Sequence, residues 1–413
     1  MTLAKMAWRN IWRNTTRTMI QVFVIAGSLF FAIWMQNLAS GSYNMMIEQS
    51  VRSGSGHLAF QHPDYLRDRK TELVFNAERP LEICKNISDI DLMLPRLQIP
   101  GLVRSSRETS SAVITGVDFA DEAKVNVFLS EKRKVDGKLP GPNEPSKAYV
   151  GIKLAERLQI KIGQKMVFMF QNIDGVITSK LYRISGLFRS GVGKVDSTMV
   201  FVERKELAKS FGRENVVHEI ALILKNRSLI ENAKKKIESK LSETDKRNLT
   251  VHDWTVTMKQ VADMIKVDHT NLEIMIMLLY VLVAIGTINL LLMSVLERTR
   301  EFGLLRAIGL GKSRIQHLIG FEAFYVGIIG SINGFLSGCA ASFYSWHYGL
   351  DFSGWFDAQE VAGMLFEPIV KSNWDWPWMF GLSCGMILMV VLASIYPASK
   401  AMKVSPSEAM RKY

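Results

Sequence analysis

The residues with the clearest chemical pattern form a short charged segment between two apolar stretches. In this segment, residues 297–309, Phe302, Leu305 and Ile308 recur at helical spacing among charged neighbours. The pattern predicts a short amphipathic helix, which Gly309 can end. Such a helix either docks into the groove of a partner protein or lies on a lipid surface. The residues alone leave both uses open.

A second candidate is Glu322, an ionisable side chain within an apolar stretch. A carboxyl group inside a membrane-spanning segment is a functional candidate by default. Glu322 lies only about one turn from the end of its stretch, so reaching the interface or pairing with a nearby Arg explains it equally well. The same stretch carries Gly330, Gly334 and Gly338 on one helix face, where small residues allow another helix to approach closely.

No group of residues predicts a catalytic or metal site. Gly311-Lys312-Ser313 resembles the end of a phosphate-binding loop, but Arg306 stands where that motif requires glycine. The 7 His residues form neither a His-Glu-x-x-His pattern nor a Cys/His cluster at metal spacing. We therefore expect a non-catalytic chain with no cofactor of its own. A membrane enzyme with a split site, or a receptor, is the alternative of a different class.

Four apolar stretches must position these residues: 19–38, 274–296, 318–343 and 378–397. A helix rises about 1.5 Å per residue and the hydrocarbon core is about 30 Å thick, so about 20 apolar residues span it. Buried helices of soluble proteins usually carry a polar stripe, which these stretches lack. The sequence predicts four transmembrane helices, one followed by three.

The distribution of Lys and Arg predicts the orientation. Segments 1–18, 297–317 and 398–413 carry 4, 5 and 4 basic residues, whereas segment 344–377 carries Lys371 alone. Basic residues concentrate in short cytoplasmic segments. Both termini and the 297–317 loop are therefore expected in the cytoplasm, and residues 39–271 and 344–377 on the outer side.

Residues 39–271 are too long for a loop and predict an α+β domain on the outer side. Short strands and helices alternate with turn signals, as at Ala112–Val117, Ile152–Leu158, Arg204–Phe211 and Glu219–Leu224. The Pro- and Gly-rich stretch 138–145 is expected to separate two subdomains.

Charge and cysteine content limit what this domain binds. The formal net charge of +12 arises largely from residues 39–271, with 37 Lys and Arg against 29 Asp and Glu. Solvated surfaces explain this excess better than an anionic partner, and nucleic acid is excluded on the outer side of a membrane. Cys84 has no partner within the domain, so no disulfide framework is expected.

Three segments resemble one known family. The run Glu297-Arg298-Thr299-Arg300-Glu301-Phe302-Gly303-Leu304-Leu305-Arg306-Ala307-Ile308-Gly309 resembles the signature of the FtsX/MacB-type ABC permease superfamily. Trp8–Asn14 resembles its N-terminus, and Tyr396–Ala401 with Ser405–Ala409 its C-terminal signature. Within the superfamily, Gly56–Phe60 and Ile114–Asp118 are most similar to lipoprotein-releasing (Lol-type, LolC/LolE) permeases.

The resemblance implies a mechanotransmitting permease of the bacterial inner membrane. Two permease chains, identical or homologous, would pair with a cytoplasmic ATPase dimer that holds ATP and Mg. The external domain would comprise a porter-like part, about 40–118 with 220–271, and a second subdomain, about 119–219. ATPase coupling would involve the following residues: Glu297, Arg298, Arg300, Glu301, Phe302, Gly303, Leu305, Arg306, Ala307 and Gly309.

In Lol-type members the substrate is a lipoprotein that passes to a periplasmic carrier. Two alternatives use the same architecture. One is MacB-like efflux of a peptide, toxin or macrolide through an adaptor protein, and the other is FtsX-like regulation of a periplasmic cell-wall hydrolase. The resemblance favours lipoprotein release over these two alternatives, whereas the residues themselves identify neither the substrate nor the periplasmic partner.

Overall fold

The computed structural model describes residues 3–141, 144, 146–352, 354, 359–361, 364–366 and 369–402. They fall into two compact units. The helical unit comprises residues 3–44, 266–352 and 369–402, and the α/β unit comprises residues 45–265 with the described part of 353–368.

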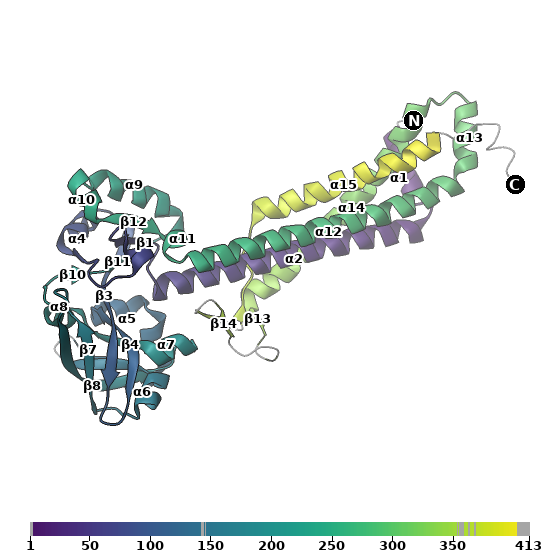
Figure 1. The fold of residues 1–413 in the computed structure, drawn as a ribbon. Helices are drawn as coiled ribbons and strands as arrows, with labels where there is room; N and C mark the ends of the chain where they lie inside the picture. The colour runs from purple at the N-terminus through teal and green to yellow at the C-terminus, as the bar shows by residue number, and fades with distance from the viewer. Residues whose placement is uncertain are drawn as a thin grey trace. The chain divides into compact units, whose positions relative to one another are not determined.

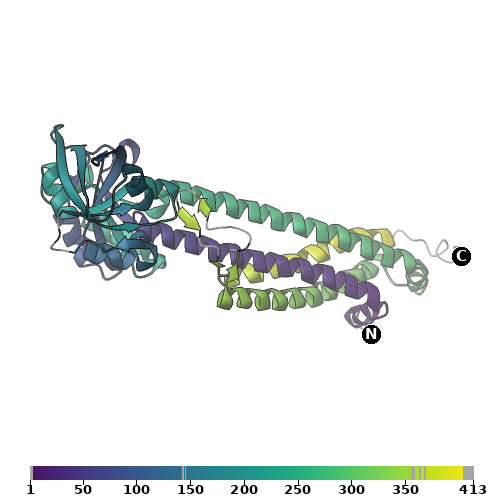
Figure 2. The same ribbon diagram turned by 90° about the horizontal axis from the view of Figure 1, so that it is seen from below.

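Four long helices dominate the helical unit: α2 (Thr15–Ser53), α12 (Lys259–Glu297), α14 (Lys312–Tyr348) and α15 (Trp376–Met402). Each is long and apolar enough to cross a membrane, which confirms the predicted four spans in the order one plus three. Figures 1 and 2 show α2 and α12 side by side, and the Tyr43 hydroxyl donates a 2.6 Å hydrogen bond to Asp268 between them. Both helices are much longer than their apolar stretches, because polar residues continue the helix.

Short elements complete the helical unit. Helix α1 (Leu3–Ile11) buries Ala7 and Ile11, and α13 (Thr299–Ala307) lies between α12 and α14 in the chain. Strand β13 (Leu350–Asp351) pairs with β16 (Ile369–Val370).

The α/β unit is built on a sheet of ten strands: β1 (Leu58–Gln61), β3 (Ile90–Arg104), β4 (Thr109–Val117), β5 (Lys134–Gly137), β6 (Lys147–Gly151), β7 (Lys165–Gln171), β8 (Ile177–Phe188), β9 (Met199–Glu203), β11 (Glu219–Leu224) and β12 (Thr250–Asp253). The order is β12-β1-β11-β3-β4-β9-β6-β8-β5, and β7 pairs with β3 and β8. Six strands therefore form a closed ring, β3-β4-β9-β6-β8-β7. Two short pairs lie apart from this sheet: β2 (Phe75–Asn76) with β10 (Val216–Val217), and β14 (Gln359–Val361) with β15 (Met364–Phe366).

The helices of the α/β unit are short. Helices α6 (Ile152–Leu158) and α8 (Arg204–Phe211) have the bounds expected from the sequence. In the described part of the unit the short helices are α3 (Tyr65–Asp68), α4 (Glu78–Lys85), α5 (Phe119–Val125), α6, α7 (Gly193–Thr198), α8, α9 (Ile230–Lys240), α10 (Glu243–Asn248) and α11 (Trp254–Thr257), with 3₁₀ turns η1 (Val127–Leu129), η2 (Glu131–Arg133) and η3 (Arg227–Leu229).

Strand β3 passes from one apolar core to another. Its first part pairs with β11 as far as Arg96, and its second part pairs with β4 from Leu97 onward. Leu97, Ile99 and Val103 pack in the core enclosed by the ring, whereas β1 and β11 contribute to a separate core with α4 and α9. The expectation that residues 40–118 form one part is therefore wrong, because the division falls within β3.

Arg96 occupies the point where β3 changes partners. Its guanidinium, almost fully buried, binds Glu122 of α5 at 2.7 Å, lies 3.6 Å from Glu219 of β11, and donates to the Gly54 carbonyl beyond α2. Buried charges of this kind are costly unless they are paired. Arg96 therefore fixes these four segments against one another.

The stretch 138–145 does not separate the two parts. It lies between β5 and β6, and both strands pair with β8 in the same sheet. Pro142, Asn143 and Pro145 lie outside the described residues.

Candidate functional site

One end of the helical unit brings together segments far apart in the sequence. Side chains from α1, α12, α13, α14 and α15 share an apolar cluster: Ala7, Val295, Phe302, Ile315, Leu318, Ile319, Ala398 and Ala401. Charged and amide side chains of α1, α2, α12 and α14 also gather at this end. This end of the unit contains the segment that the sequence analysis singled out.

Helix α13 forms where the charged segment predicts a helix. Glu301 lies in its first turn and Arg306 in its last, an arrangement that complements the helix dipole. Gly309 follows with a φ of +96°, a conformation that favours glycine and ends the helix.

The faces of α13 differ in part from the amphipathic pattern. Phe302 is 1% exposed and Leu305 is half-buried against the apolar cluster, as expected for an inner face. Ile308 is 77% exposed and Leu304 is 56% exposed. The expectation that Ile308 shares the face of Phe302 is wrong, because the helix has ended by Ile308.

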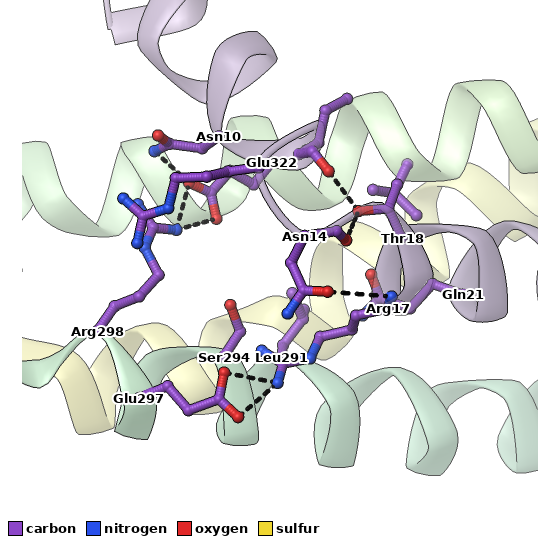
Figure 3. Close-up of a pocket in the computed structure, with 13 residues that line it drawn as sticks. Asn10, Asn14, Arg17, Thr18, Gln21, Leu291, Ser294, Glu297, Arg298 and Glu322 are labelled. Atoms are coloured by element: carbon purple, nitrogen blue, oxygen red, sulfur yellow. Dashed lines mark hydrogen bonds and ion pairs between the residues drawn. The ribbon is translucent and has the colours of Figure 1, made fainter.

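Glu322 is paired within the chain. Its carboxylate accepts hydrogen bonds from Arg298 at 3.0 and 3.2 Å and from the Asn10 amide at 2.7 Å. Figure 3 shows Arg298 and Asn10 both directed at this carboxylate. Burial disfavours charge on Arg298, but the Glu322 and Glu301 carboxylates together outweigh it and raise the pKa of the guanidinium above its ordinary value. The sequence leaves two explanations open for Glu322, and the structure confirms the one in which its carboxylate pairs with an Arg, here Arg298.

Two further ion pairs tie the N-terminal segment to the charged segment. Arg17 binds both carboxylate oxygens of Glu297 at 2.6 Å, and Arg13 pairs with Glu301, which also accepts a 3.1 Å bond from Arg298. Partial burial disfavours charge on Glu301, but its hydrogen bonds from Arg13 and Arg298 hold the pKa of that carboxyl below its ordinary value. Movement of α13 would therefore be transmitted through the Arg13–Glu301 pair to the start of α2.

In the sequence, Arg13 and Arg17 indicate only the orientation, and nothing predicts that Asn10 belongs to the site. Their partners lie about 300 positions later in the chain, 312 for Asn10 and Glu322 and 288 for Arg13 and Glu301. No spacing rule covers such a distance. The only available signal was the resemblance of Trp8–Asn14 to the family's N-terminus.

A polar cavity of about 200 Å³ lies between these ion pairs (Figure 3). Its walls come from α1, α2, α12 and α14, together with the turns that follow α1 and α12. Among the described residues, no three His, Cys, Asp or Glu side chains lie close enough to hold a metal ion.

The remaining predicted residues lie at other points of this unit. Arg300, Ala307 and Gly309 are exposed, Gly303 is buried, and Arg306 is half-buried. The three glycines of α14 face α2: a Cβ added at Gly330, Gly334 or Gly338 would lie 2.7–3.0 Å from atoms of Ile25, Ala26 or Ile33. The small residues thus allow close approach within the chain.

Residues 273–406 match the family model of the FtsX-like permease C-terminal domain. The chain contains an FtsX-like permease domain. This match covers α13, all of α14 and α15, and most of α12.

Relatives extend the similarity beyond that domain. The lipoprotein-releasing system transmembrane protein LolC of Neisseria meningitidis serogroup B is 21% identical over 343 residues, 80% of each chain. The uncharacterised ABC transporter permease MJ1507 of Methanocaldococcus jannaschii is 20% identical over 415 residues, 98% of this chain and 96% of that one. The chain is thus similar over most of its length to ABC transporter permeases, LolC among them.

Among solved structures, the chain is similar to the periplasmic region of MacB from Actinobacillus actinomycetemcomitans, with a TM-score of 0.38 and 13% identity over 53% of this chain and 98% of that one. It is also similar to the extracellular domain of YknZ from Gram-positive bacteria, with a TM-score of 0.36 and 15% identity over 48% of this chain and 99% of that one.

Proposed function

We propose that this permease couples ATP hydrolysis by a separate cytoplasmic ATPase to movements of its α/β unit on the outer side of the inner membrane. The observation that carries the proposal is the exposure of Leu304 and Ile308 at the end of α13. Exposed apolar side chains among charged neighbours are typical of an interaction surface. In this proposal ATP and Mg²⁺ bind to the partner.

The path of coupling follows from the ion pairs. A partner that pushes α13 displaces Glu301, and Glu301 holds Arg13 just before α2. Arg298 joins the same carboxylate to Glu322 of α14. Because α2 and α12 each continue into the α/β unit, a shift of their inner ends reaches that unit through continuous helix.

Release of lipoproteins is the substrate function that we favour. It is supported by the similarity to LolC, which covers 80% of both chains and therefore includes much of the α/β unit as well as the spans. Lipoproteins would leave the membrane for a periplasmic carrier, and a second permease chain would complete the transporter. The excess of Lys and Arg in the end segments supports a cytoplasmic location of both termini.

Efflux of an amphipathic molecule is a second candidate. The probable syringafactin export ATP-binding/permease protein SyfD of Pseudomonas syringae is 27% identical over 176 residues, 40% of this chain.

Depletion of the chain in the cell distinguishes lipoprotein release from efflux. Lipoprotein release predicts lipoproteins retained in the inner membrane, whereas normal sorting in the depleted strain would contradict it and favour efflux.

The docking surface is tested by purifying the chain from native membranes with its ATPase. We expect Leu304→Asp and Ile308→Asp to lower the recovered ATPase about tenfold or more, because an unpaired carboxylate buried in the interface is costly. Val135→Asp is the matched control, since Val135 is 45% exposed in the α/β unit. If both variants recover as much ATPase as the natural chain and still couple to it, the proposal is contradicted.

A further inference from the structure

The polar cavity at the end of the helical unit has the features of a ligand site. Its volume of about 200 Å³ would hold several water molecules, each of which takes about 30 Å³ in the liquid. It lies at the level of Glu322, where α14 passes from its polar first turns into its apolar stretch. Polar atoms contribute most of its wall.

Gln21 is the first observation that points to a ligand. Its side chain lines the cavity and is only 6% exposed. Its amide forms no hydrogen bond with any residue of the part of the chain that the structure describes. A buried amide without a partner is costly, so a bound group that accepts a hydrogen bond from it is favoured.

The arginines of the wall are the second observation. Each guanidinium has five N–H donors. Arg17 uses only Nη2 for Glu297, and Arg298 uses Nε and Nη1 for Glu301 and Glu322, within the described contacts. Donors of both side chains therefore stay available.

The unused donors of the wall favour a ligand rich in acceptor oxygens. Arg13, Arg17 and Arg298 line the cavity together with Glu297 and Glu322, and Glu301 pairs with Arg13 and Arg298, so the charges of these six groups balance. Arg guanidinium groups match the geometry of phosphate oxygens.

We propose that this cavity binds a phosphate-bearing anion, either the headgroup of an anionic phospholipid or free phosphate. Its oxygens accept hydrogen bonds from the Gln21 amide and from the unused donors of Arg17 and Arg298. The anion then lies beside the ion pairs that tie α13 to the N-terminal segment. This inference does not depend on the proposed transport function.

The test uses the purified full chain in an uncharged detergent. Thermal unfolding is followed while phosphatidylglycerol or inorganic phosphate is added at constant ionic strength, and the apparent affinity is taken from the rise in Tm. Gln21→Leu removes the free amide. The double variant Arg17→Met/Glu297→Gln removes one arginine together with its partner charge, so that neither charge is left without its partner.

The matched control is Arg52→Met/Glu48→Gln, which removes an exposed Arg–Glu pair in the α/β unit. We expect each cavity variant to weaken binding about tenfold or more, and the control to bind as the natural chain does. Protection by phosphatidylglycerol alone identifies a lipid headgroup, and equal protection by inorganic phosphate identifies the free ion. Absence of protection by either probe, or equal protection of the natural chain and both cavity variants, would overturn the proposal.

Discussion

His218 shows how a single residue makes the α/β unit sensitive to pH. It is fully buried, its Nδ1 accepts a 3.2 Å bond from the Gln98 backbone N–H, and its Nε2 lies 2.9 Å from the Thr71 carbonyl. Because Nδ1 accepts a bond, the proton of the neutral ring belongs on Nε2, which donates to Thr71. Burial lowers the pKa of this imidazole from 6.5 to about 4.

We expect the free energy of unfolding to fall as pH decreases from about 6.5 to 4. In this range the unfolded chain binds a proton at residue 218 that the folded chain does not bind, so protonation favours unfolding. The pKa difference corresponds to roughly 3 kcal/mol. Urea unfolding of the full chain at several pH values measures it. His218→Gln should flatten the profile relative to the natural chain and to exposed His347→Gln, and parallel profiles would contradict the assignment.

The site residues divide into those that local sequence can predict and those that it cannot. Phe302 and Gly309 follow from helical spacing and helix-end rules, which act within a few positions, whereas Glu301 is predicted only through the family resemblance. Asn10 and Arg13 enter the site only through partners about 300 positions away. Their roles depend on the packing of helices, and that packing is not encoded in any short spacing.

The element whose packing is most restrictive is α14. A Cβ added at Gly334 would lie 2.7 Å from the carbonyl oxygen of Ala26 and 2.9 Å from Leu29 Cβ, both on α2. A backbone atom cannot move aside as the end of a flexible side chain can. At Gly320 of the same helix, no atom lies within 4 Å of an added Cβ.

These two glycines give a matched pair of substitutions. Gly334→Ala should destabilise the helical unit by about 1–3 kcal/mol, because α2 and α14 must separate. Gly320→Ala should stabilise it by up to about 1 kcal/mol, because alanine has the higher helix propensity. The Tm of the purified protein measures both. Equal shifts in the same direction would show that α2 and α14 do not pack as described.

Element boundaries show where hydropathy stops being informative. The apolar stretches 19–38 and 274–296 locate α2 and α12, yet the helices are each 39 residues long. Their extensions contain charged residues, which are compatible with a helix but carry no hydropathy signal. No prediction from the sequence covers strand β3. Pro95 and Pro100 interrupt it, and proline usually argues against a strand.

At the scale of the whole molecule, the sequence predicts the four spans and the α+β domain but not the division of that domain. Composition and length suffice for the spans, because the bilayer imposes them. The division falls within a single strand at Arg96 and Leu97, and Pro95 beside it does not mark a domain boundary in the sequence because the strand continues through it. Only the pairing of β3 with strands distant in sequence defines it.

The orientation of the molecule is the remaining prediction, and it rests on the Lys and Arg distribution. Single cysteines at two exposed positions test it, Lys235→Cys in α9 and Lys312→Cys at the start of α14. Cys339 and Cys384 are replaced by alanine. Cys84 can stay, because burial raises its pKa to about 12 and leaves almost no reactive thiolate at neutral pH.

A membrane-impermeant maleimide added to spheroplasts should label the cysteine at position 235, because its segment is expected on the outer side. The cysteine at position 312 should react only after the membrane is made permeable, because the 297–317 loop is expected in the cytoplasm. The reverse pattern would place α13 on the outer side, where a cytoplasmic ATPase cannot reach Leu304 and Ile308. The coupling proposal therefore depends on this measurement as directly as on the substitutions in α13.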